Sequence, residues 1–266
     1  MAIVNESNST YHNNKAISRS GLWTLLTKTP FHLLHSQGKR SRAMAIGSAV
    51  HAAVLEPDSF VRVYVKGPED RRGNKWREAL DEAEAHGRTL LVEGDYNEVE
   101  AIAETALSNS IVQSLLSGNK LIEQSIYHTE NGVDVKVRPD LINIDKRIMV
   151  DLKTTSDASE RGFSSSVAKF GYHLQQFMYM DVYNKQGGDV DAFLFICLEK
   201  PQDGMPPIIK TYQLDEMSNI EGERIYNLAL ERYKECVDNK TFPAYGDDIG
   251  VISLPQWAYN IGGVNE

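Results

Sequence analysis

Residues 133–155 read VDVKVRPDLINIDKRIMVDLKTT and carry the strongest structural signal in the chain. Apolar and polar side chains alternate over residues 133–137 and again over residues 148–152. Alternation with a period of two is the pattern of a pleated strand. The polar cluster at residues 143–147 separates the two runs and supplies a turn. We therefore expect two antiparallel strands joined as a β-hairpin.

The register of this hairpin determines which side chains meet. With a loop of two or four residues, Asp140 lies directly across from Asp151. Opposed residues share a face of the sheet with Cβ atoms about 4.5–5.5 Å apart, and Lys153, two positions after Asp151, projects from the same face. A three-residue loop would instead place Asp140 opposite Leu152 and separate the two carboxylates.

Two carboxylates held this close repel each other, so one of them takes a proton or a cation lies between them. With Lys153 beside Asp140 and Asp151, a hard divalent cation bound by oxygen ligands balances the charges. An ordinary antiparallel sheet with a charged, solvated face produces the same alternation. The residues of the hairpin alone leave both interpretations open.

The composition is that of a globular protein without a membrane span. The chain has 266 residues, 41% hydrophobic and 24% charged, enough for one large domain or two small ones. No apolar run approaches the roughly 18 residues of a transmembrane helix, and residues 1–15 lack the pattern of a secretory signal. Cys197 and Cys236 fall in an expected strand and an expected helix, which favours reduced, buried thiols. We expect a cytoplasmic protein with no membrane partner.

The net charge of −9 argues against a general nucleic-acid coat, because phosphate contacts come from lysine and arginine. It is compatible with a nuclease, in which carboxylates gather at a metal site and basic residues gather on one face. Three basic clusters are candidates for that face, although solvated surface explains each of them more simply: Lys39, Arg40 and Arg42; Arg71, Arg72, Lys75 and Arg77; and Lys136 with Arg138.

Around the hairpin, the sequence predicts helices and strands within a single domain, residues 18–266. Residues 1–17, rich in Asn and Ser, are expected to form a flexible tail. The core is expected over residues 44–214, followed over residues 215–266 by a helix and an extended tail that covers the core or a neighbouring subunit. Helices are predicted over residues 18–34, 44–57, 74–86, 93–117, 165–185 and 215–239, and strands over residues 121–129, 191–199 and 208–214.

The hairpin also carries a known signature. Pro139 and Asp140, followed by Asp151, Leu152 and Lys153, resemble the PD-(D/E)xK motif of metal-dependent nucleases. This chain has an aspartate at 151 where a glutamate is the alternative, and the family tolerates either residue. The short motif is weak evidence by itself and gains weight from accessory motifs on either side.

Two accessory motifs resemble the RecB-like branch of these nucleases. Residues 47–55, GSAVHAAVL, are similar to its first motif, in which a histidine, here His51, ligates or supports the metal. Gln175 and Tyr179 lie four apart on a predicted helix, share a face, and resemble the accessory Gln-x-x-x-Tyr motif. A lone histidine on an Ala-rich helix is usually a packing residue, and many helices contain Gln-x-x-x-Tyr. The ordered set of matches is harder to obtain by chance than any one of them.

The flanking segments extend the resemblance to nearly the whole chain. Residues 18–22 (SRSGL) leading to Thr29 and Pro30, and residues 254–258 (LPQWA), are similar to the exonuclease VIII (RecE-type) nuclease domain of phages and prophages. The resemblance implies an α/β fold with a PD-(D/E)xK restriction-endonuclease-like core, in which helices flank a central mixed β-sheet and a helical section precedes it. It also implies a Mg²⁺-dependent exonuclease that digests one strand of linear double-stranded DNA from its 5′ end, leaving 3′ tails for recombination. The implied partners are DNA ends, a single-strand annealing protein and further copies of the chain in a ring, with a tetramer favoured.

The same resemblance assigns roles to individual residues. Mg²⁺, or Mn²⁺ as a substitute, is expected to bind His51, Asp140, Asp151 and the backbone carbonyl of Leu152. Lys153 is expected to orient or deprotonate the attacking water, and Gln175 and Tyr179 to position the substrate strand or the lysine. Two further residues are candidates for the site: Glu123, as a third carboxylate, and Arg138.

Two alternatives remain beside the exonuclease. The same site serves a structure-specific or single-strand endonuclease, which open circular DNA would distinguish from an exonuclease. A non-catalytic DNA-binding module of the same fold is the alternative from another class. The intact set of Asp140, Asp151 and Lys153 argues against that module.

Overall fold

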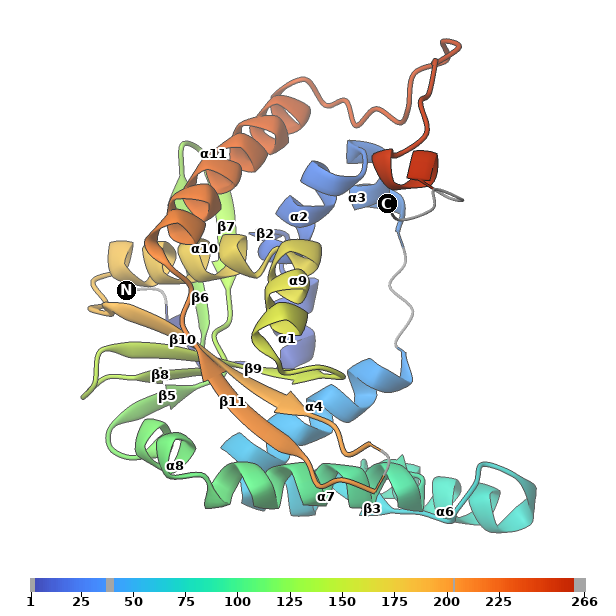
Figure 1. The fold of residues 1–266 in the computed structure, drawn as a ribbon. Coiled ribbons are helices and arrows are strands. Elements are labelled where there is room, and N and C mark those ends of the chain that lie inside the picture. The colour runs from blue at the N-terminus through green and yellow to red at the C-terminus, as the bar shows by residue number, and fades with distance from the viewer. Residues whose placement is uncertain (1–2, 37–40, 203, 261–266) are drawn as a thin grey trace.

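The computed structural model describes residues 3–36, 41–202 and 204–260, which form the expected α/β architecture (Figure 1). A five-stranded mixed sheet lies at its centre, with strands Lys120–Ile122 (β5), Leu141–Asn143 (β8), Ile148–Thr155 (β9), Ala192–Glu199 (β10) and Ile208–Tyr212 (β11). The strand order is β11-β10-β9-β8-β5. β9 runs parallel to β10, and the other neighbouring pairs are antiparallel.

The middle strand, β9, is covered on both faces. Val150 packs into a core with α4 (Arg42–Leu55) and α7 (Glu93–Ser108). Met149 points the other way, into a second core with α10 (Tyr172–Lys185). A strand buried on both faces belongs in the interior of a sheet. The second strand of the hairpin therefore lies at the centre of the sheet.

The predicted hairpin exists, but its first strand is not the predicted one. Leu141 pairs with Val150 across the four-residue loop 144–147, in the expected register. Residues Val133–Val137 instead form β7, which pairs with β6 (Ser125–Glu130) in a separate sheet. The valine alternation therefore marks a strand correctly but assigns it to the wrong partner.

The β5–β8 and β6–β7 pairs are two halves of one long ribbon. Ile122 pairs with Leu141 in the first half and Ile126 with Val137 in the second. The same number of residues separates the two ladders on each strand, so the register carries through the bend between them. The single strand predicted here is broken at Glu123, whose φ of 44° lies in the left-handed region.

The second sheet contains the start of the chain. Its strand order is β1-β6-β7-β2, where β1 is Ile3–Val4 and β2 is Ile17–Ser18. A short helix, α1 (Asn8–Asn13), connects these two strands. The prediction of a flexible tail over residues 1–17 is therefore wrong for the residues from Ile3 onward, while residues 1 and 2 lie outside the described part.

Two buried cations hold this N-terminal segment. Lys136 Nζ donates to the backbone carbonyls of Tyr11 and Asn14, both at 2.7 Å, and Arg138 Nη1 donates to the carbonyl of Glu6 at 3.1 Å. Lys136 is only 5% exposed, so these carbonyls replace the water that its ammonium loses. Burial lowers the pKa of Lys136. These two residues are therefore not part of a basic surface patch.

The remaining elements surround the two sheets (Figure 1). They are α2 (Arg19–Thr27), α3 (Pro30–His35), α5 (Pro57–Val63), β3 (Tyr64–Lys66), α6 (Gly73–Ala85), β4 (Thr89–Leu91), α8 (Ser110–Leu116), α9 (Glu160–Phe170), α11 (Glu216–Asp238) and a 3₁₀ helix, Gln256–Asn260. None of the helices in the described part combines the length and the apolar character needed to cross a bilayer. The two cysteines are free and buried, as expected.

Three of the predicted helices are each split in two. The helix predicted over residues 18–34 ends at Thr27, and α3 begins at Pro30. The helix predicted over residues 93–117 breaks at Asn109, whose side chain accepts the backbone N–H of Ile111 at 3.0 Å and caps α8. The helix predicted over residues 165–185 is interrupted by Gly171, whose φ of 68° ends α9. The break at Gly171 starts α10 in a new direction beside β9.

The tail after α11 does not lie over the core. Pro243 touches the N-terminal helices through its carbonyl, which accepts the N–H of Phe31 at 3.1 Å. Beyond it, Ile249, Val251 and Ile252 are between 94% and 99% exposed. The expectation that this tail covers its own core is therefore wrong for these residues.

Candidate active site

The acidic residues of the predicted hairpin meet at the bend of the ribbon. Asp140 directly precedes β8, and the β8–β9 ladder continues in the register that sets it across from Asp151. Asp140 Oδ2 accepts the backbone N–H of Leu152 at 2.7 Å. The preceding residue, Pro139, has no N–H and so cannot extend the ladder. The sequence thus ends the strand pairing where the first carboxylate turns toward β9.

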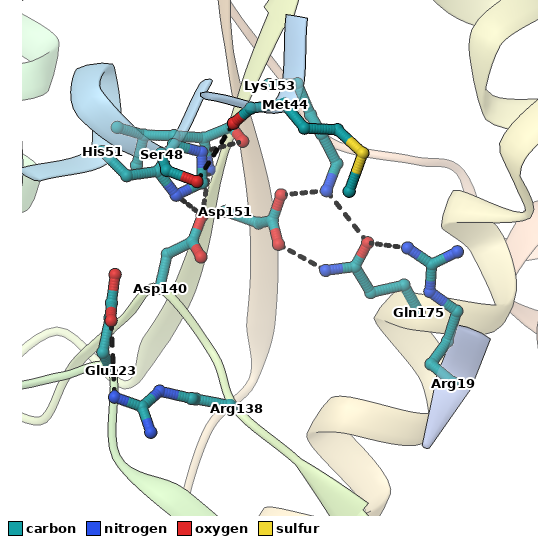
Figure 2. A network of polar contacts seen from close by, with 11 residues as sticks. Arg19, Met44, Ser48, His51, Glu123, Arg138, Asp140, Asp151, Lys153 and Gln175 are labelled. Carbon is teal, nitrogen blue, oxygen red and sulfur yellow. Dashed lines mark hydrogen bonds and ion pairs between the residues drawn. The ribbon is translucent and has the colours of Figure 1, made fainter. Parts of the chain in front are cut away.

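His51 reaches the same point from α4, the helix that packs on the Val150 face of β9. Its Nε2 lies 3.0 Å from the carbonyl oxygen of Leu152, and its Nδ1 lies 3.4 Å from Asp140 Oδ2 (Figure 2). Gly47, one turn earlier, lies close to β9, where a Cβ would be in ordinary van der Waals contact with Thr154 Oγ1 at 3.4 Å. The small residues of α4 therefore bring the histidine against the backbone of β9.

Gln175, from the first turn of α10, joins the other carboxylate to the lysine. Its Nε2 donates to Asp151 Oδ1, and its Oε1 accepts from Lys153 Nζ at 3.0 Å (Figure 2). Lys153 Nζ also contacts Asp151 Oδ2 and lies 4.4 Å from the centre of the Tyr172 ring. Gln175 is 3% exposed, so its amide is committed to this pair. The structure thus brings together the following predicted site residues: His51, Asp140, Asp151, Leu152, Lys153 and Gln175.

The charges in the site are divided unequally between the carboxylates. Burial raises the pKa of Asp151, and the nearby Asp140 carboxylate raises it further. Burial acts on Asp140 in the same direction, but His51 and Lys153 outweigh it and lower the pKa of Asp140. Burial would lower the pKa of His51, yet its contact with Asp140 raises it to about 9. At neutral pH, an imidazolium therefore bridges Asp140 and the Leu152 carbonyl.

The donors at this point suit a hard divalent cation. Two carboxylates and a backbone carbonyl are oxygen ligands of the kind that Mg²⁺ prefers, and the imidazolium already places positive charge between two of them. Asp151 Oδ2 is buried and, although it contacts Lys153, accepts no well-directed hydrogen bond. Within the described ranges, no three His, Cys, Asp or Glu side chains are grouped as a ready-made metal cluster. Binding a cation there would require His51 to release its proton.

The other predicted site residues lie around this centre with different contacts. Tyr179 lines a cavity of about 710 Å³ beside His51 and Asp140, and burial raises its pKa. Glu123 lies at the edge of the same cavity, where its backbone N–H donates to the Asp140 carbonyl at 3.1 Å. Arg138 pairs with Glu123 at 3.4 Å. Glu123 and Arg138 therefore shape the bend that presents Asp140.

Arg19 is a site residue that the sequence did not single out. Its Nη2 donates to Gln175 Oε1 at 3.4 Å, and its Nη1 donates to the Phe170 carbonyl at 2.9 Å (Figure 2). Its Nε is buried without a hydrogen-bond partner. Two cations thus point at the same amide oxygen, which fixes the orientation of the Gln175 side chain. The only available signal was the position of Arg19 inside the SRSGL segment.

Two further residues on α4 face the same centre. Met44 and Ser48 precede His51 by seven and three residues, and Figure 2 shows all three side chains on the side of α4 that looks toward Asp151 and Lys153. Met44 is 58% exposed. The i, i+4, i+7 spacing from Met44 could have indicated this shared face.

The three predicted basic clusters differ in exposure and in contacts. Arg42 pairs with the buried Asp95 at 2.5 Å, whereas Lys39 and Arg40 lie outside the described residues. The cluster on and before α6 is exposed, and Arg71 stacks on the ring of Trp76 at 5.6 Å. Among the described residues of these clusters, Arg138 lines the cavity beside His51, and none lines the cavity beside Lys153.

Comparisons with known proteins agree with this architecture. The family model described as a PDDEXK-like domain of unknown function (DUF3799) matches residues 25–255. A candidate exonuclease from Eubacterium rectale has a TM-score of 0.65 at 14% identity, over 97% of this chain and 99% of that chain. A phage-related exonuclease from Haemophilus somnus 129PT has a TM-score of 0.37 at 12% identity, over 88% of this chain and 100% of that chain. No curated protein matches at a significant level. The likeness to the first structure confirms the expected fold.

Proposed function

The chain belongs to the family described as a PDDEXK-like domain of unknown function (DUF3799), and from this premise we propose that it is a metal-dependent nuclease that hydrolyses DNA. The observation that carries the proposal is the contact network of Asp140, Asp151 and Lys153 at one point of the sheet. The PDDEXK nuclease fold generally uses divalent metal ions. We propose Mg²⁺, with Mn²⁺ as a substitute, bound by Asp140, Asp151, the Leu152 carbonyl and a deprotonated His51.

The residues around the cation have separable tasks. A divalent ion supplies a bound water of lowered pKa and neutralises the charge that grows on the phosphate. Lys153 is held between Asp151 and Gln175, so its ammonium stays in place to orient the water and to meet the scissile phosphate. Gln175 orients Asp151 through its nitrogen and Lys153 through its oxygen. Tyr179 is placed to contact the substrate strand in the cavity beside His51.

Within this class, we propose an exonuclease that digests one strand of linear duplex DNA from its 5′ end and leaves 3′ tails for recombination. The support is the resemblance of residues 18–22 and 254–258 to the exonuclease VIII (RecE-type) domain. The same resemblance supports a single-strand annealing protein as partner and a homo-oligomeric ring, with four subunits favoured. The exposed apolar residues near Ile249 leave surface available for contact between subunits.

The test uses linear duplex DNA labelled at one end, with and without Mg²⁺. Phosphorothioate bonds at the 5′ or the 3′ end report polarity, and a closed circular duplex of the same sequence reports endonuclease activity. We expect Mg²⁺-dependent loss of the linear substrate, protection by 5′ phosphorothioates only, and an intact circle. The variant Asp151→Asn is the matched inactive control.

Each outcome has a distinct meaning. Cleavage of the circle would replace the exonuclease with an endonuclease at the same site. No cleavage of any DNA by the wild-type chain, with no Mg²⁺ binding by calorimetry, would overturn the enzyme and leave a DNA-binding module of the same fold.

A further inference from the structure

A second cavity opens beyond Lys153, toward the end of β9. It has a volume of about 390 Å³ and lies between the end of β9 and helix α9. Lys153 forms one wall, so the cavity begins where the proposed reaction centre ends. Its other walls carry hydroxyl, basic and aromatic side chains, among them Thr155, Ser166, Lys169, Phe170 and Tyr172.

The charge of this cavity is opposite to that of the rest of the molecule. The chain carries a net charge of −9, yet the lining contains two lysines and no carboxylate. The cavity beside His51 is lined by three carboxylates, those of Glu56, Glu123 and Asp140, together with two cations, His51 and Arg138, that pair with two of them. The cavity beyond Lys153 is therefore the more attractive of the two for an anionic nucleic-acid backbone.

Lys169 is the free cation of this lining. It is exposed on the last turn of α9, and no carboxylate in the described ranges forms an ion pair with it, whereas Lys153 is already bound to Asp151 and Gln175. Its ammonium lies over the Phe170 ring, 5.3 Å from the ring centre. An ammonium without an ion-pair partner, next to a partly exposed aromatic ring, matches the phosphate and the base of one nucleotide.

Phe170 is both open and firmly held. Phe170 is 44% exposed, and its ring packs against the ring of Tyr172, with the two ring centres 5.7 Å apart. Its carbonyl accepts Arg19 Nη1 at 2.9 Å, and the next residue, Gly171, has a φ of 68° and no room for a Cβ against Trp23. The backbone that carries the ring is thus fixed by the same arginine that touches Gln175. A preorganised aromatic surface loses little conformational entropy when a base stacks on it.

We propose that this cavity, the Lys169–Phe170 groove, binds the nucleotide next to the scissile phosphate in a single-stranded segment of the substrate. The proposal rests on the nuclease function proposed above. The nucleotide's phosphate contacts Lys169 and the neighbouring Ser166 and Thr155, and its base stacks on Phe170. The groove offers no carboxylate or amide side chain for reading a base edge, so it binds without sequence preference.

The experiment measures binding of a fluorescent single-stranded oligonucleotide by anisotropy, with Ca²⁺ in place of Mg²⁺. The variants are Phe170→Ala and Lys169→Gln. Their matched controls are Phe31→Ala, which removes a phenylalanine of the same 44% exposure, and Arg161→Gln, which removes an exposed cation from the same helix outside the groove. Melting temperatures of all four variants check that each remains folded.

We expect Phe170→Ala to weaken binding about 5- to 100-fold, the effect of losing one stacked base. Lys169→Gln should reduce the slope of log Kd against log salt by about 0.7, the value for one phosphate of a single strand. Both variants should raise KM for DNA more than they lower kcat, and the Phe31 and Arg161 variants should behave as wild type.

The outcomes separate this proposal from the nuclease function. If the groove variants bind and cleave as wild type while Asp151→Asn is inactive, the groove is wrong and the nuclease stands. If wild-type protein does not cleave DNA, the nuclease proposal fails, and with it the groove as a substrate site. Equal losses in the groove variants and their controls would also overturn the groove.

Discussion

The surroundings of Asp140 and the surface beyond Lys153 differ in how completely their charged side chains form ion pairs. On the Asp140 side, Asp140 pairs with His51 and Arg138 pairs with Glu123, so cations and anions are matched. On the far side of Lys153, the exposed Lys169 faces solvent without an ion-pair partner among the described residues. In the proposed function, the first region exchanges a bound cation and the second receives the anionic substrate strand.

The largest expected effect comes from replacing either carboxylate of the candidate metal site. Asp140→Asn and Asp151→Asn should each reduce cleavage to background, at least about 10³-fold, because each removes an anionic metal ligand. Their effects on stability should differ. The lowered pKa of Asp140 means that its ionised form stabilises the fold above its unfolded pKa, whereas the raised pKa of Asp151 means the opposite.

At pH 8 without metal, Asp140→Asn should therefore lower the melting temperature, and Asp151→Asn should leave it unchanged or raise it. Single-turnover cleavage and thermal melts of the two variants measure both quantities. A melting temperature that falls more for Asp151→Asn than for Asp140→Asn would show that the charge division between the carboxylates is reversed.

The next effect concerns the residue that connects the two sides. Arg19 donates to Gln175 in the reaction centre and to the backbone of Phe170 in the groove. Arg19→Ala should lower kcat by roughly 10- to 100-fold, about 1.4–2.7 kcal/mol in the barrier, because the Gln175 amide loses one of two cations that orient it. Arg19→Lys should recover part of the loss.

The control is a double-mutant cycle with Gln175→Ala. If Arg19 acts through Gln175, the loss in the double variant should be much smaller than the product of the two single losses. Independent, multiplicative losses would instead assign Arg19 to another task. A crystal structure of Arg19→Ala in the absence of metal shows directly whether the amide has turned.

The smallest expected effect is the pH dependence of the metal-free protein. The pKa of His51 is raised to about 9, so the stability from its protonated form is fully present below its unfolded pKa of about 6.5 and is lost as pH rises through about 9. The melting temperature should fall by roughly 2–6 °C over this range. His51→Gln should flatten the curve.

Saturating Mg²⁺ should reverse the slope, because a metal competes with the proton for the imidazole and binds more tightly as pH rises. Calorimetry in two buffers of different ionisation enthalpy measures the proton released on binding. A melting temperature that is independent of pH in the absence of metal would remove His51 from the charge balance of the site.

The sequence predicted the reaction centre better than the scaffold that presents it. The position of Asp140 across from Asp151 could be predicted from alternation and loop length, which are local properties of the chain. The strand that pairs with Val133–Val137 could not be predicted in this way, because the same alternation suits a strand in either sheet. Single helices were predicted across Asn109 and Gly171, since one cap or one left-handed residue hardly changes a periodic pattern.

Residues whose importance depends on distant contacts were the ones missed. The start of the chain resembled a flexible tail because its composition is polar, and its anchors, Lys136 and Arg138, lie more than 120 residues away. The role of Arg19 depends likewise on Gln175, 156 positions later. Neither composition nor spacing reports such pairings, which exist only after the two sheets have formed.

The N-terminal strands also constrain how the protein is made. Strands β1 and β2 find their hydrogen-bonding partners in β6 and β7, and Lys136 follows Tyr11 by 125 positions. At about 5–20 residues per second, this interval lasts roughly 6–25 s. Residues 3–18 of the nascent chain therefore stay unpaired until β6 and β7 have been translated, and the four-stranded sheet can be completed only after that delay.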